Sequence, residues 1–431
     1  MLSKTQFPRR LAAVGALVGA AAVSLVGCSP GDDGGAVTLS VWGRALDVDE
    51  ALVAAYQEAN PDVHIELTRI PDDQFLSKLG TAMQSGDGPD VVIFDDANSS
   101  LLAASGLLED ITDRAKGLDF FDDFFPGQIG YYQDRIYSVP KQGGPSLMYW
   151  NKDLFAQAGL DPESPPATFT EVVEAASAIH AIASDVYGIS IDGACGGCIA
   201  YKLSPIIWAS GGDYLTDAGP DQKTTYATDP VVAEVFGLYR EMWAAGLAAP
   251  ADEAQDGTTQ PELFLAGKQG IFLAWPEFAK TAADAGIDFG VTSIPGIDGG
   301  TASFAGGNNI GLAAGTDQAD AGWEFITWLS DLPQQKLMAS DFGIVPVRLA
   351  LLDDAGFVEQ YPYVAQAIEA AQDGQLPNSI AYAALALNAD SPLLQAFQAI
   401  VFDGADPAGA LEAADTRSAE IIAQAYDQIG G

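Results

Sequence analysis

The stretch VVIF at residues 91–94 is a short, unbroken apolar run, which is typical of a strand buried on both faces of a sheet. Upstream of it, residues 37–42 have a strand pattern, and residues 63–67 (VHIEL) alternate strictly between apolar and polar side chains. The segments between these strands, 49–59 and 74–85, have helical patterns. Strands that alternate with helices in this way predict an α/β fold with parallel strands.

The rest of the chain first continues this pattern and then becomes helical. Further strands are expected at residues 131–140, which contain a hairpin turn, and at 147–150, 269–275 and 289–294. Thr168 and Glu171 have the spacing of a capping box, which predicts the start of a helix. Nearly everything after Asp317 has a helical pattern.

The composition is that of an acidic globular protein. The 431 residues contain 19 Lys plus Arg and 59 Asp plus Glu, which gives a formal net charge of −40. Nucleic acid is therefore not expected as a partner, because binding it needs clusters of cations. Hydrophobic residues make up 48% of the chain, which excludes a disordered polymer. The length predicts two or three domains, with room for a cleft between them.

The N-terminus has the pattern of a secretory signal. A basic segment at residues 4–10 precedes an apolar stretch, 11–26, which is shorter than the roughly 20 residues that a spanning helix needs. The stretch ends in Leu-Val-Gly-Cys28, which resembles a bacterial lipobox. That resemblance implies cleavage after residue 27 and lipid on Cys28, and two or more acyl chains make a stable anchor. Residues 28–36 then form a flexible tether. The alternative is an ordinary secretory signal with a chance cysteine.

Two cysteines remain in the sequence Ala-Cys195-Gly-Gly-Cys198. In an oxidising compartment, the favoured interpretation is a disulfide that closes a tight turn. A redox-active pair would need a helix N-terminus at the first cysteine, and the surrounding glycines do not predict a convincing helix there. Zinc binding is not supported either, because no second Cys or His pair has ligand spacing.

The search for catalytic motifs is negative. The sequence has no P-loop, no G-x-S-x-G elbow and no H-E-x-x-H motif, and its two histidines are not in a triad-like context. Asp95 and Asp96 are adjacent, and neighbouring residues do not hold the separation across a sugar ring that glycoside hydrolysis requires. We therefore expect no enzyme activity, no cofactor and no metal site.

A series of short motifs in order along the chain points to a family. These motifs are VWG (41–43), ANP (59–61), GPDVV (88–92), YSVP (137–140), LMYWNKDLF (147–155), PPATF (165–169), FLAGK (264–268) and WEFI (323–326). Each is weak alone, but their order over nearly the whole mature chain is specific. The chain resembles the extracellular solute-binding protein of a bacterial ATP-driven sugar importer, of the maltose-type binding protein family.

The resemblance implies a type II periplasmic-binding-protein-like fold. Two α/β lobes, each with a mostly parallel sheet flanked by helices, would exchange the chain at three crossings. One lobe would hold residues 37–143 and 304–330, and the other would hold 147–302 and 331–431. The implied function is to bind a sugar or oligosaccharide in the cleft and to deliver it to an ABC transporter permease. The protein would be a monomer, attached to the cell membrane by its lipid and facing the extracellular side.

The expected ligand contacts follow from sugar chemistry together with the resemblance. A pyranose ring has apolar C–H faces and a rim of hydroxyls, so its site needs flat aromatic side chains and polar groups. The candidates, mostly in loops after strands, are Trp42, Arg44, Asp95, Asp96, Asn98, Lys141, Gln142, Trp208, Trp275, Glu277, Asn308, Asn309, Arg348 and Tyr382. Core packing is the competing interpretation for Trp208 and Tyr382, whereas ligand binding is favoured for Trp275.

Two alternatives stay open at this point. The acidic balance would also suit a binding protein for a charged solute such as a polyamine, which would need several carboxylates in the cleft. An extracellular carbohydrate-acting enzyme is a further, weaker alternative. The segment around Cys195 and Cys198 is not a general feature of the family, so it could reshape the cleft and change the choice of sugar.

Overall fold

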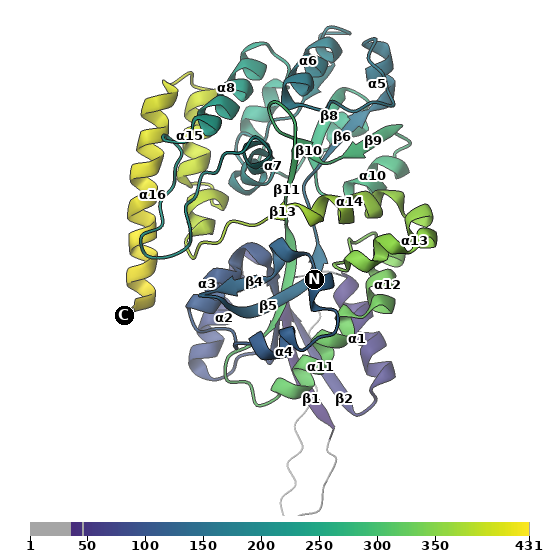
Figure 1. Cartoon of the computed structure of the whole chain (residues 1–431), viewed down its shortest axis with the longest axis vertical. Coiled ribbons are helices and arrows are strands. Elements are labelled where there is room, and N and C mark those ends of the chain that lie inside the picture. The colour runs from purple at the N-terminus through teal and green to yellow at the C-terminus, as the bar shows by residue number, and fades with distance from the viewer. Residues whose placement is uncertain (1–35, 45–46, 431) are drawn as a thin grey trace, which may run out of the picture. The chain divides into compact units, whose positions relative to one another are not determined.

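The computed structural model describes residues 36–44 and 47–430. Residues 1–35, which include the predicted signal peptide and Cys28, lie outside the described part. From residue 37 onward, the chain builds two lobes, each around a sheet of its own (Figure 1). The fold is therefore the expected two-lobe α/β arrangement.

The first lobe is built on a six-stranded sheet. Its order is β2 (Val63–Arg69), β1 (Val37–Gly43), β3 (Val91–Asp95), β12 (Gly307–Leu312), β5 (Arg135–Gly143) and β4 (Gly130–Tyr132). β1 is parallel to β2 and β3, whereas β12 is antiparallel to β3 and β5, and β4 is antiparallel to β5. Four of these six strands therefore run in one direction. β12 runs against them because it enters the sheet from the other lobe.

Burial in β3 confirms the expectation of a strand covered on both faces. Val91, Val92, Ile93 and Phe94 are all at most 2% exposed. Val91 and Ile93 belong to one apolar cluster, and Val92 and Phe94 belong to another. Since side chains alternate along a strand, the two clusters lie on opposite faces of the sheet.

Helices cover both faces of this sheet. They are α1 (Asp47–Ala59), α2 (Asp72–Ser85), α3 (Ser99–Ala104), α4 (Thr112–Lys116), α11 (Ala319–Ser330) and α12 (Leu332–Phe342). α1 packs on α11, with the ring centroids of Tyr56 and Phe325 4.9 Å apart. α12 contacts α1 and α11, so it packs on the first lobe, although the sequence-based limits begin the second lobe at residue 331. The exact lobe limits stay a prediction.

The second lobe is built on a four-stranded sheet. Its order is β7 (Tyr187–Ile189), β8 (Gln269–Ala274), β6 (Leu147–Asn151) and β9 (Phe289–Thr292). β6 alone runs against the other three strands. The surrounding helices are α5 (Lys152–Gln157), α6 (Phe169–His180), α7 (Gly196–Ala209), α8 (Pro230–Ala244), α9 (Glu262–Leu265), α10 (Phe278–Asp284), α13 (Ala355–Gln360), α14 (Pro362–Gln372), α15 (Pro392–Val401) and α16 (Pro407–Gly430).

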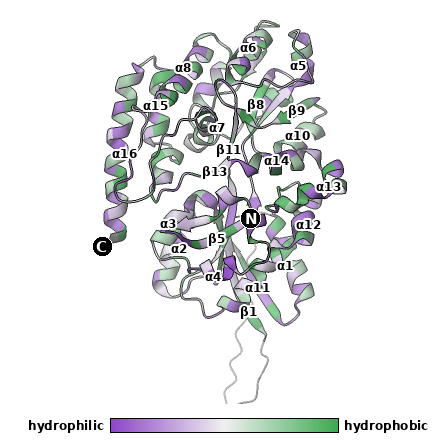
Figure 2. Cartoon of the chain, viewed as in Figure 1, coloured by the Kyte–Doolittle hydropathy of each residue, from purple (hydrophilic) through white to green (hydrophobic). Residues whose placement is uncertain are grey.

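Local sequence explains where these helices begin and which face they bury. The Thr168 hydroxyl accepts a hydrogen bond from the Glu171 backbone N–H at 3.0 Å, so the predicted cap starts α6. Figure 2 shows hydrophobic and hydrophilic residues alternating along α16. Its buried positions include Leu411, Ala414 and Ile422, as expected for an amphipathic outer helix.

Short elements complete the fold. A small sheet joins β10 (Ile294–Pro295), β11 (Thr301–Phe304) and β13 (Gly374–Gln375). Residues Ala383–Leu387 form a π-helix, and short 3₁₀ helices lie at Asp96–Asn98, Phe121–Asp123, Pro126–Gln128, Pro250–Ala254 and Leu349–Asp353. Among the described residues, no helix is both long and apolar enough to cross a membrane.

The segments that connect the lobes lie side by side. The Gly144 N–H donates to the Gly306 carbonyl at 3.1 Å, and the Gly143 N–H donates to the Val345 carbonyl at 2.9 Å. Gly306 has a φ of +57°, and a Cβ there would lie 2.3 Å from the Gly144 oxygen. Only glycine allows this close approach. Glycines therefore allow the connecting segments to approach each other closely at the base of the cleft.

Candidate functional site

A cavity of about 470 Å³ lies between the two lobes, within the range usual for small-molecule sites. From the first lobe it is lined by Arg44, Asp95, Asp96, Ala97, Gln142, Gly143, Gly307 and Asn308. From the second lobe it is lined by Gly197, Cys198, Tyr201, Lys202, Gln260, Trp275, Glu277 and Leu387. The connecting segments contribute Gly144, Phe304 and Gly306. Seven of the candidates from the sequence are in this set.

The polar wall of the first lobe forms where β1 and β3 end. Nη1 of Arg44, just after β1, donates to Oδ2 of Asp95 at 2.9 Å and to Oδ1 of Asn308 at 3.0 Å. These three residues come from three neighbouring strands of the sheet, which explains how distant parts of the sequence meet. Arg44 and Asp95 are both partly exposed, so a ligand can reach them.

Asp96 lies deeper in the same wall and is only 1% exposed. Its Oδ2 has no hydrogen-bond partner among the described residues. Burial, together with the neighbouring Asp95 carboxylate, raises the pKa of Asp96 well above its ordinary value. The unpartnered Oδ2 can accept a hydrogen bond from a hydroxyl group of a ligand.

The opposite wall carries an aromatic ring beside a second carboxyl group. Trp275 follows β8 and is 37% exposed, and its ring packs edge-on against Phe272 and Phe278. Glu277 lies two residues further on, and burial raises its pKa to about 7. This wall therefore has the flat surface that a sugar ring requires.

The sequence did not identify four important side chains of the cavity. Tyr201 and Lys202 lie on α7, Phe304 ends β11, and Gln260 lies in the loop before α9. The Tyr201 hydroxyl donates to the Gly144 carbonyl at 2.7 Å, which ties α7 to the connecting segment. Tyr201 and Lys202 sit in an apolar helical stretch and look like core residues in the sequence. Only the unusual cysteine segment just before them indicated a change in the cleft.

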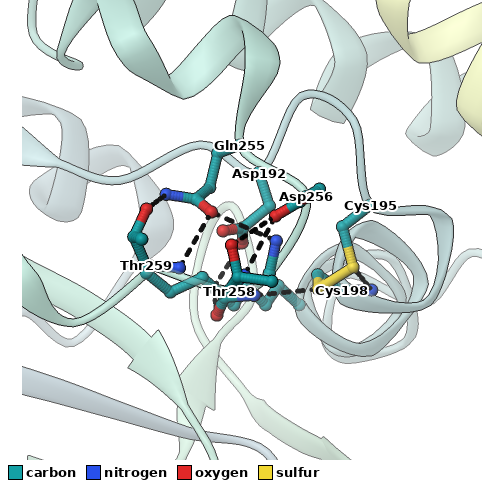
Figure 3. Close-up of a disulfide and its surroundings, with 10 residues drawn as sticks. Asp192, Cys195, Cys198, Gln255, Asp256, Thr258 and Thr259 are labelled. Atoms are coloured by element: carbon teal, nitrogen blue, oxygen red, sulfur yellow. Dashed lines mark hydrogen bonds and ion pairs between the residues drawn. A yellow bond between two sulfur atoms is a disulfide. The ribbon is translucent and has the colours of Figure 1, made fainter. Parts of the chain in front are cut away.

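Cys195 and Cys198 are joined by a disulfide at the start of α7 (Figure 3). The expectation that the glycines here do not open a helix was therefore wrong, because Cys195 caps a helix that begins at Gly196. The Cys195 sulfur accepts a hydrogen bond from the Cys198 N–H at 3.1 Å, so it caps the helix. Because Cys198 lines the cavity, the disulfide forms part of the cleft wall.

Four candidates lie within the first lobe and away from the cavity. Trp42 packs against the apolar cluster around Phe75 and Val92. Lys141 is 1% exposed and forms an ion pair with Asp49. Asn98 ends the 3₁₀ helix that begins at Asp96 and does not line the cavity.

Asn309, the fourth, is fully buried, and its Nδ2 donates to Ser99, Gln128 and Ser138.

Three further candidates also lie elsewhere. Arg348 donates from Nε to Asp123 at 2.5 Å and from Nη1 to the Ser330 carbonyl at 2.7 Å. Tyr382 is 1% exposed, and its hydroxyl lies 3.0 Å from that of Tyr214, which is a core environment. Trp208 stacks on Tyr214 and Phe304 and lines a separate cavity of about 210 Å³.

The family model for bacterial extracellular solute-binding proteins matches residues 46–336, which is more than half of the chain. The chain belongs to this family. This solute-binding protein is 31% identical in sequence to the maltotriose-binding protein of Pyrococcus abyssi over 319 residues. The match covers 72% of this chain and 65% of the length of that relative.

Solved structures give the same fold. The solute-binding protein matches the cyclic α-maltosyl-1,6-maltose binding protein from Arthrobacter globiformis with a TM-score of 0.79 and 24% identity, over 90% of this chain and 100% of that one. It matches the sugar-binding protein MalE from Xanthomonas citri with a TM-score of 0.78 and 21% identity, over 90% and 98% of the two chains. Both similarities support the two-lobe fold expected from the sequence.

Proposed function

We propose that this solute-binding protein captures a sugar or oligosaccharide outside the cell and delivers it to the permease of an ABC importer. The observation that carries the proposal is the cleft between the lobes, where the exposed ring of Trp275 faces polar groups such as Arg44 and Asp96. Aromatic faces bind the C–H surface of a sugar, and the polar groups bind its hydroxyls. The relative that binds maltotriose supports a glucose oligosaccharide as the ligand.

Capture requires the lobes to move about their connecting segments. Gly143, Gly144 and Gly306 lie where these segments meet, and backbone without side chains can absorb changes in dihedral angle. We infer that a ligand bridges Asp96 on one lobe and Trp275 on the other and favours the closed arrangement. The permease would then bind the closed form, because only that form presents both lobes in fixed positions.

The protein works outside the cell on this proposal. Cleavage after residue 27 would leave Cys28 as the lipid-carrying N-terminus, and residues 28–36 would tether the two lobes to the membrane surface. The lobe limits predicted from the sequence, and a monomeric state, belong to the same proposal. We propose capture without chemical conversion of the sugar.

A ligand screen tests this function. Thermal-shift measurements with maltose, maltotriose and other oligosaccharides, followed by calorimetric titration of the best one, should give a raised melting temperature and one site per chain. Spermidine and putrescine test the alternative of a binding protein for a charged solute. The p-nitrophenyl glycosides test the alternative of a carbohydrate-acting enzyme. Stabilisation by the polyamines alone, or release of nitrophenol, would replace the proposed function with one of the alternatives.

A further inference from the structure

The disulfide at the start of α7 lies in the wall of the cleft rather than on a distant surface. Cys198 and Gly197 both line the cavity. Figure 3 shows that a loop carrying Gln255, Thr258 and Thr259 lies beside the two cysteines. The bond therefore lies between the helix that carries Tyr201 and Lys202 and the loop that leads to Gln260.

A chain of contacts runs from the disulfide to a buried cation. Nε2 of Gln260 lies 2.9 Å from the sulfur of Cys198, and its Oε1 accepts a hydrogen bond from Nζ of Lys202 at 3.1 Å. Lys202 also pairs with Asp192. Gln260, Lys202 and Asp192 are 7%, 4% and 1% exposed. Since Gln260 and Lys202 both line the cavity, the sulfur contacts the same amide that directs the cation.

The loop is packed directly onto the disulfide. Gly257 has a φ of +100°, and a Cβ there would lie 3.2 Å from the Cys198 sulfur and 3.4 Å from the Cys195 sulfur. Within the loop, the Gln255 side chain accepts from the Gly257 N–H and donates to the Thr259 hydroxyl. The loop thus has its own hydrogen bonds, and it meets α7 at the two sulfurs and at Gln260, whose side chain contacts both Cys198 and Lys202.

The first turn of α7 is packed tightly against the end of the π-helix at Gly196. A Cβ on Gly196 would lie 2.7 to 2.8 Å from three carbonyl oxygens at the end of the π-helix, those of Ala386, Leu387 and Asn388. Reduction breaks the sulfur–sulfur bond, and two electrons and two protons from a dithiol reagent convert it to two thiols. The two sulfurs then separate to van der Waals contact. Because the π-helix blocks one direction, we expect the displacement to reach Gly257 and Gln260, which lie against the sulfurs.

We propose that the Cys195–Cys198 disulfide is a positioning element of the ligand site, which sets where Gln260 and Lys202 face the cleft. The expected effect of the disulfide on ligand affinity rests on the proposed function. The loss of the bond lowers ligand affinity and leaves the fold intact, because the bond closes a loop of only a few residues and removes little chain entropy.

Hydrogen exchange on the ligand-free protein tests the positioning without any ligand. Exchange is followed by mass spectrometry in oxidised wild type, in wild type with dithiothreitol, and in the Cys195→Ser/Cys198→Ser variant. Amides of residues 196–203 and 257–262 should exchange faster in the last two samples, while β6 (147–151) serves as an unchanged control. Equal exchange in both segments with and without the bond would overturn the proposal. Dithiothreitol should have no effect on the double-serine variant.

Affinity then tests the consequence, with maltotriose as the probe. The double-serine variant should bind roughly tenfold more weakly, and Gln260→Ala should show a similar loss. The triple variant Cys195→Ser/Cys198→Ser/Gln260→Ala should bind maltotriose no more weakly than the double-serine variant or Gln260→Ala. The loss of the disulfide and the loss of the amide act through the same contact. Additive losses, or an unchanged dissociation constant in the double-serine variant, would contradict the inference. If no sugar binds oxidised wild type, the proposed function fails, and the exchange measurement still decides the positioning.

Discussion

Trp275 is the side chain on which ligand affinity should depend most. It is 37% exposed in the cleft wall, so it contributes less to the apolar core than a buried ring does. Trp275→Ala should weaken binding of the best sugar by about thirtyfold, or roughly 2 kcal/mol, with a small change in unfolding free energy. Calorimetric titration and chemical unfolding measure the two effects.

Trp323 provides the matched control for this change. It lies on α11, away from the cavity, and packs against the core of the first lobe. Trp323→Ala should therefore lower stability and leave sugar affinity unchanged. If Trp275→Ala behaves like Trp323→Ala, the assignment of Trp275 to the ligand site is wrong.

Glu277 should make stability depend on pH in a defined direction. Burial raises its folded-state pKa from 4.5 to about 7, so the folded protein binds this proton more tightly than the unfolded chain does. The free energy of unfolding should therefore fall as the pH rises from about 4.5 through 7.

Glu277→Gln removes this ionisation. The variant should be more stable than wild type above pH 7, by on the order of 1 to 3 kcal/mol, and the difference should shrink towards zero below about pH 4.5. Urea unfolding of both proteins between pH 4 and pH 8 measures it. Parallel pH profiles would show that Glu277 titrates as an ordinary surface carboxyl group.

At the level of elements, the close approach of the connecting segments at Gly306 should tolerate no side chain. Gly306→Ala places a Cβ 2.3 Å from the Gly144 carbonyl and should cost about 2 kcal/mol or more of stability, along with much of the ligand affinity. Gly315 also has a positive φ, but nothing lies within 4 Å of a Cβ there. Gly315→Ala therefore carries the backbone cost alone, and equal melting temperatures for the two variants would contradict the close-approach argument.

The alternation of side chains along each strand explains which site residues could be identified from the sequence. Asp95 and Asn308, two of the candidates named from the sequence, line the cavity. Within a strand, however, adjacent side chains point to opposite faces. Asn308 lines the cavity while Asn309 is buried in the core. The sequence does not indicate which face of these strands borders the cleft.

Long-range packing explains the residues that the sequence missed. The helical segment 196–209 is almost entirely apolar, so Tyr201 and Lys202 look like core positions until α7 is placed beside the connecting segments. Gln260 gives no local signal, because its role depends on a sulfur 62 positions earlier in the chain. Arg348 was expected at the site, yet its partners Asp123 and the Ser330 carbonyl hold it away from the cavity.

At the level of the whole molecule, Cys28 should determine where the protein is found. Cells grown with labelled palmitate should incorporate the label into wild type and not into Cys28→Ser, which should be released or remain unprocessed. Cys198→Ser retains the lipobox and should stay in the membrane fraction as a control. Wild-type protein recovered from the medium without lipid on its N-terminal peptide would contradict the lipoprotein prediction.

The position of β12 has a consequence for how the protein is made. This strand lies between β3 and β5 in the middle of the first sheet, yet the ribosome produces it roughly 170 residues after β5. At about 5 to 20 residues per second, the first sheet lacks its central strand for on the order of ten seconds or more of synthesis. A chain stopped at residue 304 should stay sensitive to protease, whereas the complete chain should resist it. We therefore expect the interleaved order to delay folding of the first lobe until most of the chain has been synthesised.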